Sequence, residues 1–285
     1  MSVEHAPRTA TWACALAACL LTAPAASYAA ATEPPAASTP TPAQATPAPL
    51  PSDPNEPVAV TVKDPMSVLV EPGKEQKLSN ETTITRWAHA QSTSKILSEP
   101  RPGARTITRL RYLTEDKAAE VYIVLAAMLD ANQRTWLKIR VPMRGHGRTG
   151  WVLAEDLSAP YVVRTQLVID RKSLKATLRK NGQKIWQASV GIGKAGTPTP
   201  NGDFWIRERL KGLGNNSAYG PWAFGTSAYS NISDWPGGGV VGIHGTNEPG
   251  KIPGRPSHGC VRLRNDKIRS LVRLMPIGTP VRIVR

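Results

Sequence analysis

Short apolar runs separated by turn residues recur along most of this chain, and they are too short for helices. The strongest turn signal is Asn181-Gly182, which separates residues 175–179 from residues 184–190 as a two-residue hairpin loop would. Residues 58–85 alternate weakly and predict one or two strands. Further strands are expected at 107–110, 121–125, 136–141, 150–152, 166–170, 202–208, 240–244 and 281–284. The pattern predicts a mainly β protein.

One helix is expected near the C-terminus, where the apolar spacing changes from two to between three and four. Asn265 or Asp266 is the expected N-cap, and Pro276 ends the helix. Its apolar face comprises Ile268, Leu271, Val272 and Met275. The fold class is therefore mainly β with one clear helix.

Residues 1–31 have the pattern of a secretory signal peptide. Arg8 precedes the uncharged, apolar residues 9–21, and small residues near position 30 suit a cleavage site. An alternative is a lipobox that would leave Cys19 lipidated. The sequence thus predicts an exported protein of the periplasm or cell wall.

The three cysteines divide unevenly between the signal and the rest of the chain. Cys14 and Cys19 lie inside the predicted signal, so the mature protein would keep Cys260 alone. A single thiol in an exported protein cannot form an internal disulfide, which makes Cys260 a candidate reactive group. The alternative is a buried cysteine that packs as a small apolar side chain.

Two segments are expected between the signal and the C-terminal part of the chain. Residues 32–57 are rich in Pro, Ala and Thr and predict an extended linker. Residues 58–157 predict a small β-barrel. Trp87 and the segments 136–139 and 149–152 resemble bacterial SH3-like domains. This resemblance implies a module that binds the cell wall or positions substrate, with a structural spacer as the alternative.

Positive charge is concentrated in the C-terminal part of the chain. Residues 57–157 contain 15 Lys and Arg against 11 Asp and Glu, whereas residues 158–285 contain 20 against 6. A domain with net charge +14 attracts polyanions. Because the chain is predicted to be exported, the expected partners are anionic cell-wall polymers rather than nucleic acid.

One stretch near the C-terminus brings a thiol, two imidazoles and a guanidinium within twenty residues. If the chain after Ser257 is extended, the side chains of His258, Cys260 and Arg262 point to one face. Cys260 is then a candidate nucleophile and His244, at the end of an apolar run, its base.

A free thiol has a pKa of about 8.5, so a reactive cysteine needs a base or positive surroundings. His258 and Arg262 are expected to lower the pKa of Cys260. The turn at Gly259 offers backbone N–H groups where an acyl oxyanion would form. The guanidinium of Arg262 could bind a substrate carboxylate through two parallel hydrogen bonds. These parts together indicate thiol acyl transfer.

His244, twelve intervening residues and then Ser257-His258-Gly259-Cys260-Val261-Arg262 resemble the signature of the L,D-transpeptidase (YkuD-like) catalytic domain. The resemblance assigns residues 160–285 to this domain. Three further segments also match: 196–204, 219–223 and 244–247.

The resemblance implies a cysteine enzyme that acts on peptidoglycan stem peptides without a cofactor. Cys260 would attack the carbonyl of the third stem residue, expel D-Ala, and pass the acyl group to an amine in a 3-3 cross-link. His244 would be the base, oriented by the Gly245 carbonyl, and carbapenems would acylate Cys260. The residues that would shape the oxyanion site are Ser257, His258, Gly259 and Gly245. The residues that would contact substrate are Arg262, Trp222 and Tyr219.

Other cysteine and metal enzymes fit less well. In papain-like and NlpC/P60-like peptidases the Cys precedes the His and starts a helix, and in sortase-like enzymes the Arg lies further from the Cys. A zinc hydrolase could use His244, His258 and Cys260, but only Glu248 and Asp266 lie near as acids. A non-enzymatic wall-binding protein is another alternative. Water or a protein lysine as acceptor would make the same chemistry a carboxypeptidase or an anchoring reaction.

Residues 191–196 match G-x-G-x-x-G by letter. A dinucleotide-binding motif must open a helix, whereas Thr197-Pro198-Thr199-Pro200 follows here. The segment is therefore expected to be a loop.

Overall fold

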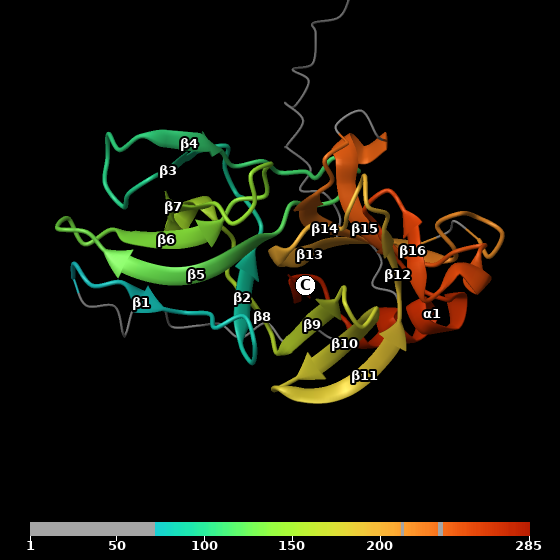
Figure 1. Ribbon diagram of the computed structural model, residues 1–285. Coiled ribbons are helices and arrows are strands. Elements are labelled where there is room, and N and C mark those ends of the chain that lie inside the picture. The colour runs from blue at the N-terminus through green and yellow to red at the C-terminus, as the bar shows by residue number, and fades with distance from the viewer. Residues whose placement is uncertain (1–71, 212–213, 233–235) are drawn as a thin grey trace, which may run out of the picture. The chain divides into compact units, whose positions relative to one another are not determined.

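The structure is a computed structural model that describes residues 72–211, 214–232 and 236–285 (Figure 1). The predicted signal peptide at 1–31 with its two cysteines, the linker at 32–57 and the strand expected from residue 58 lie outside the described residues. None of the helices in the described part is long and apolar enough to cross a membrane.

The first sheet, called the N-terminal sheet below, has the strand order β4-β3-β7-β6-β5-β2-β8, with β1 paired to β5. The strands expected at 107–110, 121–125, 136–141 and 150–152 are confirmed as β4 to β7. Its strands are β1 (Gln76–Lys77), β2 (Thr85–Ala88), β3 (Lys95–Leu97), β4 (Thr106–Arg109), β5 (Tyr122–Leu129), β6 (Thr135–Arg140), β7 (Thr149–Leu153) and β8 (Tyr161–Val163). The SH3-like character of this part stays a prediction.

The second sheet has the order β11-β10-β9-β18-β13-β14-β15-β17-β12-β16. Its strands are β9 (Thr165–Asp170), β10 (Lys175–Lys180), β11 (Gln183–Ser189), β12 (Gly191–Gly193), β13 (Gly202–Lys211), β14 (Trp222–Tyr229), β15 (Val240–His244), β16 (Gly254–Ser257), β17 (Val261–Arg262) and β18 (Pro280–Val284). The helices are α1 (Asn265–Leu274) and the 3-10 turns η2 (Ala154–Asp156), η3 (Pro236–Gly239) and η4 (Pro249–Lys251). The mainly β fold class with one α-helix is confirmed for the described residues.

The hairpin predicted at Asn181-Gly182 is confirmed. It joins β10 to β11, and both turn residues have positive φ, 51° for Asn181 and 81° for Gly182. Two central residues with φ above zero match the right-handed twist of the flanking strands, which is why this dipeptide is such a strong turn signal. The expectation that 191–196 is a loop is wrong for its first half, because Gly191–Gly193 forms β12 between β17 and β16.

Strand β14 was not predicted, although it lies between β13 and β15 and is buried almost along its whole length. Small residues interrupt its apolar pattern. At Gly225 an added Cβ would come within 2.2 Å of the Glu208 carboxylate, so only glycine fits against the neighbouring strand. Close packing of two strands here removed the alternation on which sequence patterns depend.

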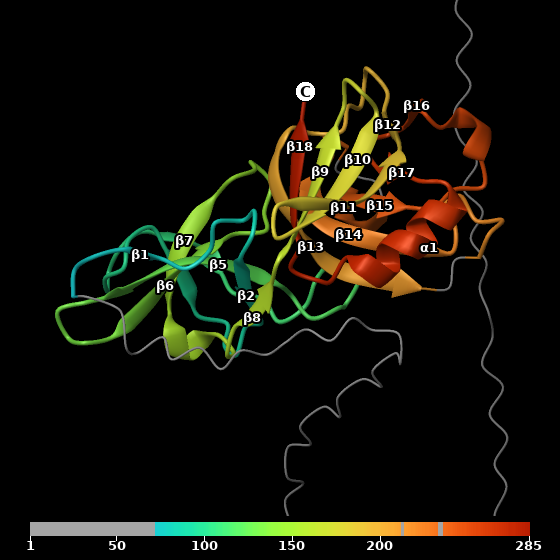
Figure 2. The ribbon, with the colours of Figure 1, turned by 90° about the horizontal axis from the view of Figure 1, so that it is seen from below.

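Helix α1 packs across β14, and its buried face is the predicted one (Figure 2). The predicted cap is wrong: the N-cap position is Arg264, and no side chain caps the helix. The Asn265 side chain instead accepts a hydrogen bond from the Thr246 N–H at 2.9 Å. Asn265 therefore ties the start of the helix to the chain that leaves β15.

The described residues fall in one compact unit, and the two sheets share an apolar cluster. The Trp205 indole N–H donates to the Val121 carbonyl at 2.8 Å in this cluster, and both residues are buried. Its members, called the shared cluster below, are Trp87, Val121, Ile123, Val163 and Trp205.

A buried ion network lies beside the shared cluster. Arg207 of β13 has a fully buried side chain and donates to both carboxylate oxygens of Glu120, itself fully buried. Arg207 also donates to Glu115 at 2.8 Å. Burial alone would lower the pKa of Arg207, but the hydrogen bonds and charges of its carboxylate partners raise it. The charge of Arg207 in turn helps to lower the pKa of Glu115 to about 2, although burial acts in the opposite direction. The second sheet thus supplies the cation and the N-terminal part supplies the carboxylates.

Candidate active site

Two neighbouring parallel strands bring the sequence-predicted residues together. β15 pairs with β17 so that His244 lies opposite Arg262. Since side chains on one face of a strand are two residues apart, Gly242 and His244 share a face with Cys260 and Arg262. The Gly242 N–H lies 3.4 Å from Cys260 Sγ, and a Cβ added at Gly242 would contact both the sulfur and the His244 ring. Glycine at this position leaves the space between thiol and imidazole open.

His244 is 3 % exposed, and its ring has one fixed partner. Its Nδ1 lies 2.6 Å from the Gly245 carbonyl oxygen, which can only accept a hydrogen bond. Nδ1 therefore carries the proton and Nε2 keeps a free lone pair. Burial lowers the pKa of His244 to about 4, so the imidazole is neutral at pH 7.

Cys260 is a partly buried free thiol. Burial raises its pKa, although the Gly242 N–H and the charge of Arg262 act in the opposite direction. The lowered pKa of Cys260 expected from the neighbouring cations is therefore wrong. Loss of hydration outweighs the attraction of the nearby guanidinium.

The turn before Cys260 is held by Ser257, which is buried. Ser257 Oγ donates to the Cys260 carbonyl at 2.6 Å and accepts from the Gly259 N–H at 3.2 Å. Gly259 has φ of 128°, a conformation that disfavours other residues. The Gly259 N–H is directed to Ser257, and the Cys260 N–H next to it is a candidate donor to an oxyanion.

We expect Ser257→Ala to lower the free energy of unfolding by about 1–3 kcal/mol, because two backbone groups at Gly259 and Cys260 lose their partner. Urea unfolding of the full chain measures this change. Ser189→Ala, at an exposed position on β11, is the control and should leave the midpoint unchanged. Equal midpoints for the two variants would show that Ser257 does not brace the turn.

Arg262 is partly buried and lies at the edge of the same site. Its Nη1 donates to the Glu248 carboxylate at 2.9 Å. Its Nε is buried and has no hydrogen-bond partner in the described part of the chain. One side of the guanidinium is thus occupied by Glu248, whereas the Nε N–H keeps an unused hydrogen-bond capacity.

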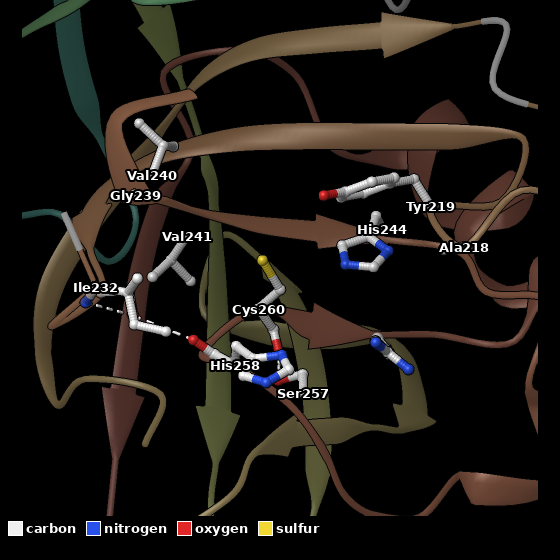
Figure 3. A pocket seen from close by; sticks show the side chains of 12 residues that line it. Ala218, Tyr219, Ile232, Gly239, Val240, Val241, His244, Ser257, His258 and Cys260 are labelled. Atoms are coloured by element: carbon white, nitrogen blue, oxygen red, sulfur yellow. Dashed lines mark hydrogen bonds between the residues drawn. The ribbon is translucent and has the colours of Figure 1, made fainter. Parts of the chain in front are cut away.

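A pocket of about 230 Å³ opens at these residues (Figure 3). The Tyr219 ring lies beside the His244 ring, with 4.8 Å between centroids. The lining residues are Ala218, Tyr219, Ser230, Ile232, Gly239, Val240, Val241, His244, Ser257, His258, Cys260 and Arg262. Of the sequence-predicted substrate contacts, Trp222 is absent from this lining and packs on the core beneath Lys211.

Sequence reasoning missed several residues that shape the pocket. Ser230 and Ile232 follow β14, the strand that was not predicted. Thr199 is fully buried, and its hydroxyl accepts from the Gly193 N–H and donates to the Gly259 carbonyl at 2.7 Å. No spacing rule relates these positions to Cys260, and only the matching segment 196–204 drew attention to Thr199.

His244, His258 and Cys260, the ligands of the zinc alternative, do not form a metal-binding cluster. Across residues 72–285, leaving out the two short undescribed stretches, no group of three or more His, Cys, Asp or Glu side chains could hold a metal ion.

Comparison with known proteins agrees with this geometry. The family model of the YkuD L,D-transpeptidase catalytic domain matches residues 164–283. YkuD of Bacillus subtilis, which carries the name L,D-transpeptidase, is 31 % identical over 170 residues, covering 59 % of this chain and 91 % of its own. The L,D-transpeptidase ErfK/SrfK of Salmonella typhimurium is 29 % identical over 178 residues, covering 56 % of this chain and 55 % of its own.

Among solved structures, an L,D-transpeptidase of Enterococcus faecium is 25 % identical, with a TM-score of 0.35, and the match covers 42 % of this chain and 49 % of that one. The family assignment rests on the relatives in sequence and on the family model. With most of the YkuD chain covered at 31 % identity, this chain belongs to the L,D-transpeptidase family.

Proposed function

We propose that this protein is a peptidoglycan L,D-transpeptidase whose nucleophile is Cys260 and whose base is His244. The observation that carries the proposal is that the imidazole at the end of β15 and the thiol on the turn directly before β17 line one pocket, where a Cβ added at Gly242 would contact both. Membership of the family supports the reaction type.

The resting pair is a neutral thiol and a neutral imidazole, because burial raises the pKa of Cys260 and lowers that of His244. An ion pair would have to be desolvated in this buried site, which is unfavourable. Proton transfer therefore accompanies attack: the Cys260 proton moves to His244 Nε2 while the sulfur bonds to the substrate carbonyl carbon.

During acylation the proton that His244 takes from Cys260 is passed on to the leaving group. The carbonyl oxygen becomes an oxyanion, for which the Cys260 N–H is a candidate hydrogen-bond donor. Collapse of this intermediate breaks the bond to the terminal D-Ala, and His244 gives its proton to the leaving amine. A thioester between Cys260 and the third stem residue remains.

Deacylation runs the same steps in reverse with a different nucleophile. An amine of a neighbouring stem attacks the thioester, His244 accepts the amine proton, and the thiolate leaves and recovers that proton. The product is an amide, the 3-3 cross-link. Water in place of the amine would give a carboxypeptidase, and a protein lysine would give an anchored protein.

Substrate binding is assigned to the polar groups that line the pocket. The buried Arg262 Nε N–H would donate to a stem carboxylate, and the Tyr219 ring would bound the side next to His244. Stem peptides and anionic wall polymers suit the net charge of +14 over residues 158–285. The proposed partners and the predicted signal both support a location in the periplasm or cell wall.

The test is intact mass spectrometry of the wild type and Cys260→Ala, each incubated with a carbapenem and, separately, with tetrapeptide-stem muropeptides. We expect a drug adduct, release of D-Ala and a cross-linked dimer with the wild type, and none of these with Cys260→Ala. Release of D-Ala without a dimer would identify a carboxypeptidase. An adduct on Cys260→Ala would exclude Cys260 as the nucleophile.

A further inference from the structure

Arg144 belongs to the loop between β6 and β7 of the N-terminal sheet, yet its guanidinium binds the second sheet. Its Nη1 donates to the Ser230 carbonyl at 2.8 Å. Its Nη2 donates to the Gly238 carbonyl at 2.7 Å and also lies 3.4 Å from the Ile232 carbonyl. One side chain therefore binds three backbone oxygens that follow β14 or precede β15.

These carbonyls belong to two arms of one connection, which are also bonded to each other. The Ser230 N–H donates to the Gly239 carbonyl at 2.8 Å. Gly239 has φ of 78°, and a Cβ at this position would come within 2.2 Å of the Ile232 carbonyl oxygen and within 2.7 Å of Arg144 Nη2. Glycine is therefore needed here first for the close approach of the two arms, and the Arg144 guanidinium lies against the same point.

The same two arms form a wall of the catalytic pocket. Ser230, Ile232 and Gly239 line it together with Cys260. Ser230 Oγ donates to the His258 carbonyl at 3.1 Å and accepts from the Ile232 N–H at 3.4 Å. The wall is therefore bonded on one side to the turn that carries Cys260 and on the other to Arg144.

A second contact holds the same place. The Arg144 guanidinium lies 5.3 Å from the centre of the Tyr229 ring, within the range of a cation–π interaction. The Tyr229 hydroxyl donates to Glu115 at 2.7 Å. Arg144 and Glu115 both precede the second sheet in the chain. Tyr229, the last residue of β14, is therefore held by two side chains that belong to the N-terminal sheet and its loops.

We infer that Arg144 is a positioning residue, through which the N-terminal sheet sets the pocket wall against which the donor stem peptide lies. The inference rests on the proposed function for the identity of the substrate. Arg144 does not line the pocket and touches none of the reacting atoms. If Arg144 has this role, the N-terminal sheet helps to position the substrate. It would then do more than bind the cell wall or separate the second sheet from the linker.

The first experiment compares full-length wild type, Arg144→Ala, Arg144→Lys and Arg148→Ala. Arg148 is exposed on the same loop and is the control. We expect Arg144→Ala to lower kcat/KM for a tetrapeptide muropeptide by about 10- to 100-fold, because small displacements of a substrate-positioning wall have effects of this size. Alkylation of Cys260 by iodoacetamide, which needs no wall, should change less than about twofold. Arg144→Lys should recover part of the loss.

The second experiment measures amide hydrogen exchange in the same variants. Arg144→Ala should speed exchange at 226–232 and 238–241 and leave β9 to β11 unchanged. Wild-type kcat/KM together with unchanged exchange would overturn the inference, as would an equal loss of activity in Arg148→Ala. If the wild type itself does not turn over muropeptides, the proposed function fails, and the exchange result alone decides whether Arg144 holds the wall.

Discussion

His244→Ala should reduce the second-order rate constant for acylation of Cys260 by a carbapenem by roughly 10²–10⁴-fold, the contribution of a positioned general base. The buried thiol has a raised pKa and cannot supply thiolate by itself. Truncation of the ring leaves a space beside Cys260, so added imidazole should restore part of the rate. Mass spectrometry of the adduct over time measures both effects. Acylation of His244→Ala at the wild-type rate would exclude His244 as the base.

The pH dependence of the wild type follows from the same residue. Burial lowers the pKa of His244 to about 4, against roughly 6.5 for a solvated histidine. The base form is therefore present above about pH 4 and is lost only as the pH falls through that value. The acylation rate should be flat from about pH 5.5 to pH 8. An acid limb centred near 6.5 would show that the ring is solvated or paired with a thiolate.

Arg207→Ala should lower the free energy of unfolding by about 3–5 kcal/mol, a large part of the 5–15 kcal/mol typical of folded domains. The variant leaves the buried carboxylate of Glu120 without its bidentate partner. Urea unfolding of the full chain measures the change.

Two variants test the physical reason for that loss. Arg209→Ala, two residues along the same strand with a partly exposed side chain, should cost less than about 1 kcal/mol. Arg207→Met combined with Glu120→Leu removes both charges and should be more stable than Arg207→Ala. Glu120 keeps a salt bridge to Arg111 at 2.8 Å in Arg207→Ala. If the double variant is the least stable, the cost comes from lost packing and not from the loss of the buried bidentate ion pair.

The strands with regular alternation could be predicted from the sequence because each buries one face. The hairpin at Asn181-Gly182 could be predicted because its backbone conformation restricts the residue type. β14 could not, since its packing against β13 requires small residues such as Gly225 that erase the pattern. The helix could be predicted but its cap could not, because the Asn265 side chain bonds to Thr246 in the segment that follows β15.

Some features of the candidate site could also be predicted from the sequence, and others could not. His244 and Arg262 lie on adjacent strands and Cys260 directly precedes the second of them, at positions that spacing and alternation relate, and the structure brings all three to one pocket. Trp222, expected at the substrate, packs on the core. The direction of the Cys260 pKa shift could not be read from charge alone, because burial is a property of the fold. Arg144 is 86 residues from its partner Ser230, a separation that no local pattern reports.

The shared cluster means that the limits of the family match are not the limits of a folding unit. A fragment cut at residues 164–283 would keep Trp205 and Arg207 but lose Val121 and Glu120, their partners. The Trp205 indole and the Arg207 guanidinium, both buried in the full chain, would be exposed on the surface of this fragment, and Arg207 would lack Glu120. Moving this catalytic fold onto another neighbour would therefore require the β13 face to be redesigned, so the two parts of the chain are expected to be inherited together.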